Sequence, residues 1–390
     1  MQKTVTKELS KGYEKNIAGK TIKVEEGVFW IQKQRQKHSL HHITPYQASF
    51  APQIPEFFIK NYSTRGNKVL DPFAGRGTTI LEANISGRIG IGFDISPLAI
   101  QIAKAKLKNI TYEEIEKRLY EIDFSKEILN GYDEFKYIYH HKTYSQIMNL
   151  KKQLGNNRTD TFIKAIILCR LHGHSPSFFS VFTFNVISPS AKAIRKMSER
   201  HHSKPEFRDV VPRILKKAKT VLRDSIIEQK ESYVKIANSN KLPLKNNSID
   251  MIITSPPFLA AINYIDDNWL RFWFLGYEKE NLRKTLIQTN NMEDYKKFIK
   301  SSMNEMHRVL KSKKYCIIEV GDVGNNGKRV NLEELIIELA SETGFEVEKI
   351  LINHISAPKI SKAFSKNAKN KGTKTNRCVI MKKYDNKLND

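Results

Sequence analysis

The chain has 390 residues, of which 40% are hydrophobic and 10% aromatic, so a packed core is expected and global disorder is excluded. The formal net charge is +25, because 66 Lys and Arg residues outnumber 41 Asp and Glu residues. This excess disfavours an enzyme of small metabolites and favours a polyanionic partner such as nucleic acid, with a generally Lys-rich proteome as the alternative.

Other protein classes are excluded by what the sequence lacks. No apolar run reaches the roughly 18–20 residues that span a bilayer, and residues 1–20 lack the apolar core of a signal peptide. Cys169, Cys316 and Cys378 form no CxxC pair, which argues against a disulfide framework. The paired histidines match no zinc signature. We therefore predict a cytoplasmic protein without a membrane anchor or a metal.

Between residues 68 and 108 the chain alternates apolar runs with segments of helical pattern. The predicted strands are 68–70 and 89–93, and the predicted helices are 79–85 and 97–108. The sequence DPFAGRGTT, at residues 71–79, connects the first strand to the first helix, and Asp94 ends the second strand. This βαβ unit predicts the start of a doubly wound sheet. Before it, residues 1–45 are polar with one strand-like run at 24–31.

The alternation stops at about residue 111 and resumes after residue 227. The segment 111–227 is charged and mostly helical in pattern, and it is too long for a structureless loop. Beyond it, strands are predicted at 233–236, 249–254, 315–320, 345–355 and 378–382, and helices at 294–311 and 331–343. We therefore expect an N-terminal extension (1–41), one α/β domain (42–110 and 228–390) and an inserted lobe (111–227).

The DPFAGRGTT turn suits a nucleoside ligand that carries a cationic group. Gly75 and Gly77 let the backbone approach a ligand, and Asp94 can accept both hydroxyls of a ribose. A dinucleotide would also fit a glycine turn followed by an acid. However, GxGxxG is absent, and the initial acid Asp71 disfavours a pyrophosphate. S-adenosylmethionine has the amino group, sulfonium and ribose that match these residues. A glycine turn that serves packing alone is the other interpretation.

The sequence TSPPF, at residues 254–258, has the properties of an acceptor site for an amino group. Pro256 and Pro257 fix φ and remove two backbone donors, so the loop is rigid and its carbonyl oxygens project. An exocyclic base amine is a poor nucleophile because its lone pair is delocalised. Acceptors at Ser255 Oγ and the Pro256 carbonyl would hold that lone pair out of conjugation, and Phe258 can stack on a flipped-out base. Taken alone, SPPF could equally be a turn made of prolines.

Together these motifs resemble those of the amino-directed DNA methyltransferases. DPFAGRGTT and Asp94 resemble motifs I and II of that family, and TSPPF resembles motif IV. Tyr46, Phe50 and Pro52 resemble motif X, which closes over the methionine part of the cofactor. The resemblance covers roughly residues 42–108 and 232–384. It implies a Rossmann-like class I methyltransferase with a mixed seven-stranded sheet and a mainly helical insertion lobe.

The resemblance also implies which residues form the site. Those that would bind S-adenosyl-L-methionine are Phe50, Asp71, Pro72, Phe73, Ala74, Gly75, Gly77, Thr78, Asp94 and Ile95. The catalytic residues would be Ser255, Pro256, Pro257 and Phe258. At one position the chain departs from the family. The acid that usually precedes motif IV, near the end of the preceding strand, is replaced by Asn238-Ser239.

Two basic segments are expected to contact double-stranded DNA. The stretch from Lys192 to Arg223 contains few acids, and residues 356–376 contain six lysines and no acid. The expected contacts are Arg195, Lys196, Arg200, Arg208, Lys366, Lys369 and Lys371. The order of the motifs resembles the α-type arrangement, in which the target-recognition region lies between motifs I and IV. A solvated helical face is the alternative for the first segment.

From these motifs we predict a site-specific DNA methyltransferase that modifies cytosine N4, as in a restriction-modification system with a separately encoded endonuclease. Ser255 is the form of motif IV that is usual in cytosine-N4 enzymes. Adenine N6 is the nearest alternative target, followed by RNA and by a binding protein with a degenerate methyltransferase fold. Cytosine-C5 chemistry is excluded, because it needs a cysteine beside a proline and no cysteine here follows one.

Overall fold

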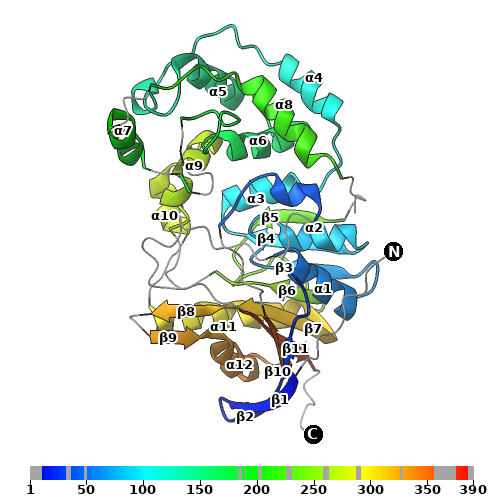
Figure 1. Cartoon of the computed structure of the whole chain (residues 1–390). Helices are drawn as coiled ribbons and strands as arrows, with labels where there is room; N and C mark the ends of the chain where they lie inside the picture. The colour runs from blue at the N-terminus through cyan, green and yellow to red at the C-terminus, as the bar shows by residue number, and fades with distance from the viewer. Residues whose placement is uncertain are drawn as a thin grey trace.

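Nine strands of the computed structural model form one mixed sheet (Figure 1). They are β1 (Lys11–Ile17), β2 (Lys20–Gly27), β3 (Lys68–Asp71), β4 (Ile89–Asp94), β5 (Tyr233–Ile236), β6 (Ile249–Thr254), β7 (Leu310–Val320), β10 (Phe345–His354) and β11 (Thr375–Lys383). Their order is β1-β2-β10-β11-β7-β6-β3-β4-β5. A separate hairpin joins β8 (Asp322–Asn325) to β9 (Lys328–Asn331). The structure describes residues 11–31, 37–47, 51–181, 183, 187–188, 190–200, 204–224, 231–257, 263–286, 291–325, 328–354 and 375–384.

The strands from β5 to β7 are parallel and lie beneath helices on both faces. Alternate residues of each strand point to opposite sides. Val69 and Met251 pack against α1 (Gln53–Tyr62). Leu70 and Ile252 belong to the cluster that includes α11 (Met292–Val309) and α12 (Leu332–Glu342). The remaining helices beside these strands are α2 (Thr78–Ile85) and α3 (Pro97–Lys104). The doubly wound sheet predicted from the sequence is therefore confirmed.

The predicted number of seven strands is wrong, because the N-terminal segment adds two. Strand β2 pairs in parallel with β10 over Lys349–Asn353, and β1 pairs with β2 in a hairpin. Ile17, Ile22 and Val24 are buried in the same apolar cluster as β7, which explains why this polar segment docks on the sheet. The other seven strands include the antiparallel β11 between β7 and β10, so the sheet is mixed as predicted.

Between β4 and β5, the five described α-helices that follow α3 form a helical lobe at one end of the molecule (top of Figure 1). They are α4 (Tyr112–Tyr120), α5 (His141–Gln153), α6 (Arg158–Arg170), α7 (Ala191–Arg200) and α8 (Val210–Val221). Two later helices, α9 (Trp269–Leu275) and α10 (Lys279–Thr285), lie beside the lobe. The lobe shares its apolar core with the sheet domain, because Leu81 of α2, Leu98 of α3 and Phe272 of α9 belong to the same cluster as Ile163 of α6. The division at residues 111 and 227 stays a prediction.

Three properties of the described residues bear on the expectations from the sequence. No helix among them is long and apolar enough to cross a membrane. Cys169, Cys316 and Cys378 are all buried and unpaired, so none of them forms a disulfide. Within the described ranges, no group of three or more His, Cys, Asp or Glu side chains is placed to hold a metal ion.

Candidate active site

Four polar residues come together at the carboxyl ends of neighbouring parallel strands. Asp71 ends β3, Asp94 ends β4 and Thr254 ends β6, while Glu319 is the last residue but one of β7. In open parallel sheets this edge is where ligands bind, because the loops that follow the strands diverge there. We call it the carboxyl edge. It contains both motifs that the sequence singled out.

Asp71 connects the two motifs through hydrogen bonds. Thr79 donates its hydroxyl to Asp71 Oδ2 at 2.6 Å, and Thr254 donates its hydroxyl to Asp71 Oδ1 at 2.6 Å. The Phe73 amide also donates to Oδ1, at 3.1 Å. Burial raises the pKa of Asp71 to about 6, although these hydrogen bonds oppose the rise. The carboxylate therefore holds the glycine-rich turn against the strand that carries the catalytic motif.

Asp94 holds the other side of the glycine-rich turn. The Gly75 amide donates to Asp94 Oδ2 at 2.8 Å, and the Ser96 amide donates to Oδ1 at 2.8 Å. Burial raises the pKa of Asp94, while these amides oppose the rise. Gly75 has φ +49°, in the left-handed region. The remaining predicted residues of the turn, Pro72, Phe73, Ala74 and Thr78, lie between β3 and the first residue of α2.

Gly77 is needed for packing, and its contact with the cofactor stays a prediction. Its φ is +76°, and a Cβ added there would lie 2.7 Å from Cβ of Ala103 in α3. Arg76, between the two glycines, turns inward and donates to the carbonyl of His41 at 3.1 Å. The ammonium of the buried Lys106 donates to the Arg76 carbonyl at 2.6 Å. Basic side chains thus fix the turn on its buried side.

Two tyrosines and two isoleucines border the turn. The Tyr46 ring lies near Gly75 and 6.3 Å from the Tyr264 ring, measured between centroids. Burial and the charge of Asp94 raise the pKa of Tyr46. Ile95 is 39% exposed, and Ile236, in the next strand, is 57% exposed. Ile236 lies opposite Asp94 in the pairing of β5 with β4. The two isoleucines therefore offer apolar surface beside Asp94. The predicted cofactor residue Phe50 lies outside the described residues.

The predicted catalytic motif, TSPPF, follows β6, and its serine is hydrogen-bonded to a buried acid. Ser255 donates its hydroxyl to Glu319 Oε2 at 2.7 Å, and Asn376 Nδ2 donates to Glu319 Oε1 at 2.9 Å. Burial raises the pKa of Glu319, and the hydrogen bonds from Ser255 and Asn376 oppose this. Tyr295 of α11 donates its hydroxyl to the Pro257 carbonyl at 3.1 Å. Pro256 lies between these contacts, whereas Phe258 is outside the described residues.

Three residues of this network are absent from the set predicted from the sequence. They are Thr254, Glu319 and Asn376, which contact Asp71, Ser255 and Glu319 respectively. A signal for Glu319 exists, because it is the one acid in the otherwise apolar run 316–320. Asn376 has no such signal, since its place opposite β7 depends on the pairing of β11.

The residues expected to contact DNA fall into three groups. Arg195, Lys196 and Arg200 lie on the exposed face of α7, where Arg195 also pairs with Glu199 at 2.8 Å. Arg208 points into the lobe and donates to backbone carbonyls, Phe178 O at 3.2 Å among them. Arg208 therefore has structural contacts within the lobe, and its contact with DNA stays a prediction. Lys366, Lys369 and Lys371 lie outside the described residues.

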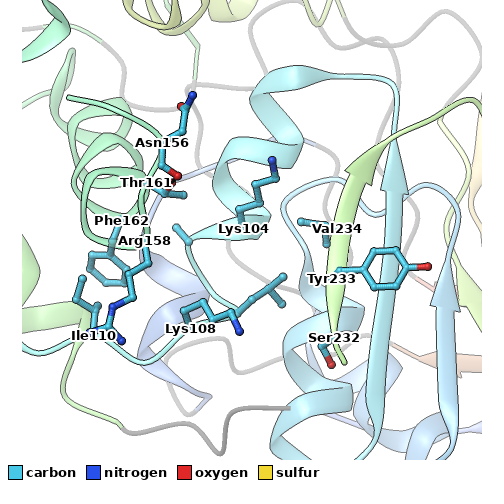
Figure 2. A pocket seen from close by; sticks show the side chains of 12 residues that line it. Lys104, Lys108, Ile110, Asn156, Arg158, Thr161, Phe162, Ser232, Tyr233 and Val234 are labelled. Atoms are coloured by element: carbon cyan, nitrogen blue, oxygen red, sulfur yellow. Dashed lines mark hydrogen bonds between the residues drawn. The ribbon is translucent and has the colours of Figure 1, made fainter. Parts of the chain in front are cut away.

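A cavity of about 290 Å³ lies away from the carboxyl edge, at the start of β5 (Figure 2). Lys104 and Lys108 line it from the end of α3 and the turn that follows, Arg158 and Phe162 line it from α6, and Val234 lines it from β5 (Figure 2). None of the predicted cofactor or catalytic residues reaches it. The cavity is therefore separate from the site formed by the two motifs.

Comparison with known proteins places these motifs in a family. A segment of 109 residues is 38% identical to the type II methyltransferase M.MjaII of Methanocaldococcus jannaschii, covering 27% of this chain and 20% of that protein. A longer match of 323 residues is 25% identical to the type II methyltransferase M.BsoBI of Geobacillus stearothermophilus, covering 74% of this chain and 63% of that protein. The chain thus spans less than two thirds of each relative.

A solved SAM-dependent methyltransferase from Methanosarcina mazei aligns with 84% of this chain and 97% of its own, at 11% identity and a TM-score of 0.35. The family model described as DNA methylase, for the N6 and N4 enzymes, matches residues 2–105 and 249–389. These segments make up more than half of the chain and include both motifs of the carboxyl edge. The chain belongs to this DNA methylase family.

Proposed function

We propose that this protein is an S-adenosylmethionine-dependent DNA methyltransferase that methylates an exocyclic amino nitrogen, with cytosine N4 as its target. The observation that carries the proposal is the hydrogen bond of 2.7 Å from the Ser255 hydroxyl to buried Glu319. It commits the serine proton to the carboxylate and leaves the Oγ lone pairs free to accept. An acceptor at this position suits an amino group and does not suit a carbonyl or a phosphate.

The residues of the carboxyl edge fit the cofactor. Asp94 provides carboxylate oxygens for ribose hydroxyls beside the turn that its own hydrogen bonds hold in place. The exposed side chains of Ile95 and Ile236 offer apolar surface to an adenine ring. At the start of α2, the buried Thr78 hydroxyl has no hydrogen-bond partner among the described residues, so it is available to a polar group of the cofactor. When bound, S-adenosylmethionine supplies an electrophilic methyl group.

Around the target base, the chain's residues act by positioning. Ser255 Oγ accepts one N–H of the amino group, and the Pro256 carbonyl accepts the other. The nitrogen lone pair is then held out of conjugation with the ring and directed at the methyl group. When the N–C bond forms, the nitrogen must lose a proton. Ser255 can take this proton as it passes its own to Glu319, whose raised pKa suits it to accept.

DNA as the substrate is supported by charge as well as by family. The chain carries a formal net charge of +25, and α7 presents Lys196 and Arg200 to solvent. Cytosine N4 is favoured over adenine N6 because Ser stands first in the catalytic motif. Two relatives are named type II methyltransferases, which supports a role in restriction-modification beside a separate endonuclease.

The proposal is tested by incubating the full chain with labelled S-adenosylmethionine and unmethylated genomic DNA. Nucleoside digestion and mass spectrometry then identify the product. We expect the product to be N4-methylcytosine. The Ser255→Ala variant should bind the cofactor normally but transfer the methyl group about 10²–10³-fold more slowly. N6-methyladenine alone would overturn the choice of base, and labelling of tRNA without labelling of duplex DNA would overturn the choice of substrate.

A further inference from the structure

We propose that residues 173–178 of the helical lobe form the element that reads base sequence in duplex DNA. We call this segment, GHSPSF, the reading loop. The proposal rests on the proposed function, because it names the part of the DNA interface that gives the methyltransferase its sequence specificity. It differs from the expectation that α7 and residues 356–376 contact DNA, since those contacts are with phosphates.

Two arginines fix the backbone of the reading loop from the side of the protein. Arg213 donates through Nε to the Pro176 carbonyl at 2.8 Å. Arg208 donates to the carbonyls of Phe178, at 3.2 Å, and of Ser180. Because a guanidinium is planar and rigid, several such bonds to one loop restrict it to one conformation. The carbonyls of the loop are thereby turned inward.

The aromatic end of the loop is fixed as well. The Phe178 ring packs so closely on Gly173 that a Cβ at Gly173 would lie 2.3 Å from it. The Arg170 guanidinium lies 5.0 Å from the centre of the same ring, and its Nη1 donates to Ser177 Oγ at 3.4 Å. A preorganised loop of this kind loses little conformational entropy when it binds.

The tip of the loop is polar and accessible. His174 and Pro176 are exposed, and Ser175 and Ser177 are partly exposed. The two serine hydroxyls lie 2.7 Å apart. Hydroxyl and imidazole groups can donate to and accept from base edges, so the tip has the chemistry of direct readout.

The charge beneath the tip favours a polyanion. In the described part of the chain, Arg170, Arg208 and Arg213 form no ion pair with a carboxylate. Three positive charges therefore lie under one short loop, and Glu206 near Arg208 and Asp209 near Arg213 offset them only in part. Each of these guanidiniums donates to the reading loop through one nitrogen. The net positive field of the three arginines attracts phosphates to the loop.

The base of the reading loop is tied to the segment that follows the catalytic motif. His172 Nε2 and Ser188 Oγ are 2.9 Å apart and both residues are buried. The Ser188 amide donates to the Asp267 carbonyl at 2.7 Å. Gln47, from the motif X segment, donates to Asp267 Oδ2 at 2.9 Å. A fixed spacing between the loop and the catalytic motif is what site-specific methylation needs, because one base is read while another is modified.

The test compares tip variants of the full chain with a matched control. The tip variants are His174→Ala and the double change Ser175→Ala with Ser177→Ala, and the control is Lys136→Ala, an exposed lobe residue elsewhere. Each is incubated with S-adenosylmethionine and methylation-free genomic DNA, and modified positions are mapped by single-molecule sequencing. We expect the tip variants to methylate the wild-type sequence about tenfold more slowly, or to accept changed bases within it. The control should match the wild type.

Two further measurements separate reading from stability and from phosphate contact. Cofactor affinity by calorimetry and affinity for a random duplex should stay within twofold of the wild type in the tip variants. Arg208→Lys keeps the positive charge but removes the planar guanidinium that holds the loop carbonyls. We expect this variant to lose sequence specificity as the tip variants do. The inference is overturned if the tip variants methylate the same sequence at an unchanged rate, or if they lose affinity equally for the random duplex. Absence of any methylation by the wild type would instead contradict the proposed function, and the reading role with it.

Discussion

Ser255 follows β6, and Glu319 lies near the end of the adjacent parallel strand β7. The Ser255 hydroxyl donates to the buried Glu319 carboxylate at 2.7 Å. Nothing in the motif TSPPF predicts this partner. In the proposed reaction, this hydrogen bond orients the Ser255 Oγ lone pairs to accept from the amino group. It also lets Glu319 receive the proton that Ser255 releases when the amine loses its own. In the proposed reaction, activity therefore requires the ionised form of one buried acid, Glu319.

Glu319→Gln should therefore slow methyl transfer and abolish its dependence on acidic pH. A glutamine can still accept from Ser255, but it cannot take up the proton, so we expect methyl transfer to slow by about 10²-fold. Because burial raises the pKa of Glu319, the wild-type rate should fall as the pH drops through that raised pKa. The variant should lack this acidic limb. A measurement of single-turnover rate against pH decides it, and an identical limb in the variant would assign the limb to another group.

Asn376→Leu tests the second partner of the same carboxylate. The change removes the hydrogen bond of 2.9 Å to Glu319 Oε1, which stabilises the ionised form. The pKa of Glu319 should then rise further, and the acidic limb of the rate profile should move to higher pH. At high pH the rate should approach that of the wild type. A uniform loss of rate at every pH would instead indicate damage to the sheet.

Asp71→Asn should change how stability depends on pH. The pKa of Asp71 rises from 3.8 to about 6 in the folded protein, so the folded state binds more protons than the unfolded state between these values. The stability contributed by this group is thus complete below about pH 4 and is lost as the pH rises to about 6, by roughly 3 kcal/mol. Urea unfolding at several pH values should show this decline in the wild type and a smaller one in the variant. The control Asp133→Asn, at a side chain that is 93% exposed, should keep the wild-type slope.

Gly77→Ala should destabilise more than Gly75→Ala. Both glycines have positive φ, so each substitution costs about 1–2 kcal/mol in backbone strain. At Gly77 the new methyl group also meets Ala103 at 2.7 Å, which adds roughly 1–3 kcal/mol, whereas at Gly75 the nearest atom lies 3.8 Å away. Thermal unfolding of the two variants gives the difference. Equal melting temperatures would show that α3 can move aside.

Local patterns predicted most of the sheet. The strands β5 and β6 have the predicted bounds, and β3, β4, β7, β10 and β11 overlap the predicted runs, because short apolar segments flanked by turn residues identify buried parallel strands. The hairpin of β1 and β2 was not predicted as such. Its exposed, polar residues alternate too weakly, and its stability comes from pairing with β10, more than 300 residues away.

The residues of the candidate site were likewise predicted only in part. Residues within contiguous motifs, such as Asp71, Asp94 and Ser255, meet at one edge of the sheet, as their positions at strand ends predict. Glu319 and Asn376 join them only through strand pairing, which a motif does not contain. The contact of Arg208 with the Phe178 carbonyl was not predicted, because charge alone cannot tell whether a guanidinium faces solvent or a carbonyl.

The apolar cluster that joins α2, α3 and α9 to the helical lobe has an evolutionary consequence. A recognition module with its own core can be exchanged between enzymes as a cassette. Here, exchange of the lobe alone would leave Leu81, Leu98 and Phe272 facing foreign side chains. If the lobe reads base sequence as we propose, new specificity should arise by point changes on its surface. Chimaeras should keep their fold only if α9 is transferred with the lobe.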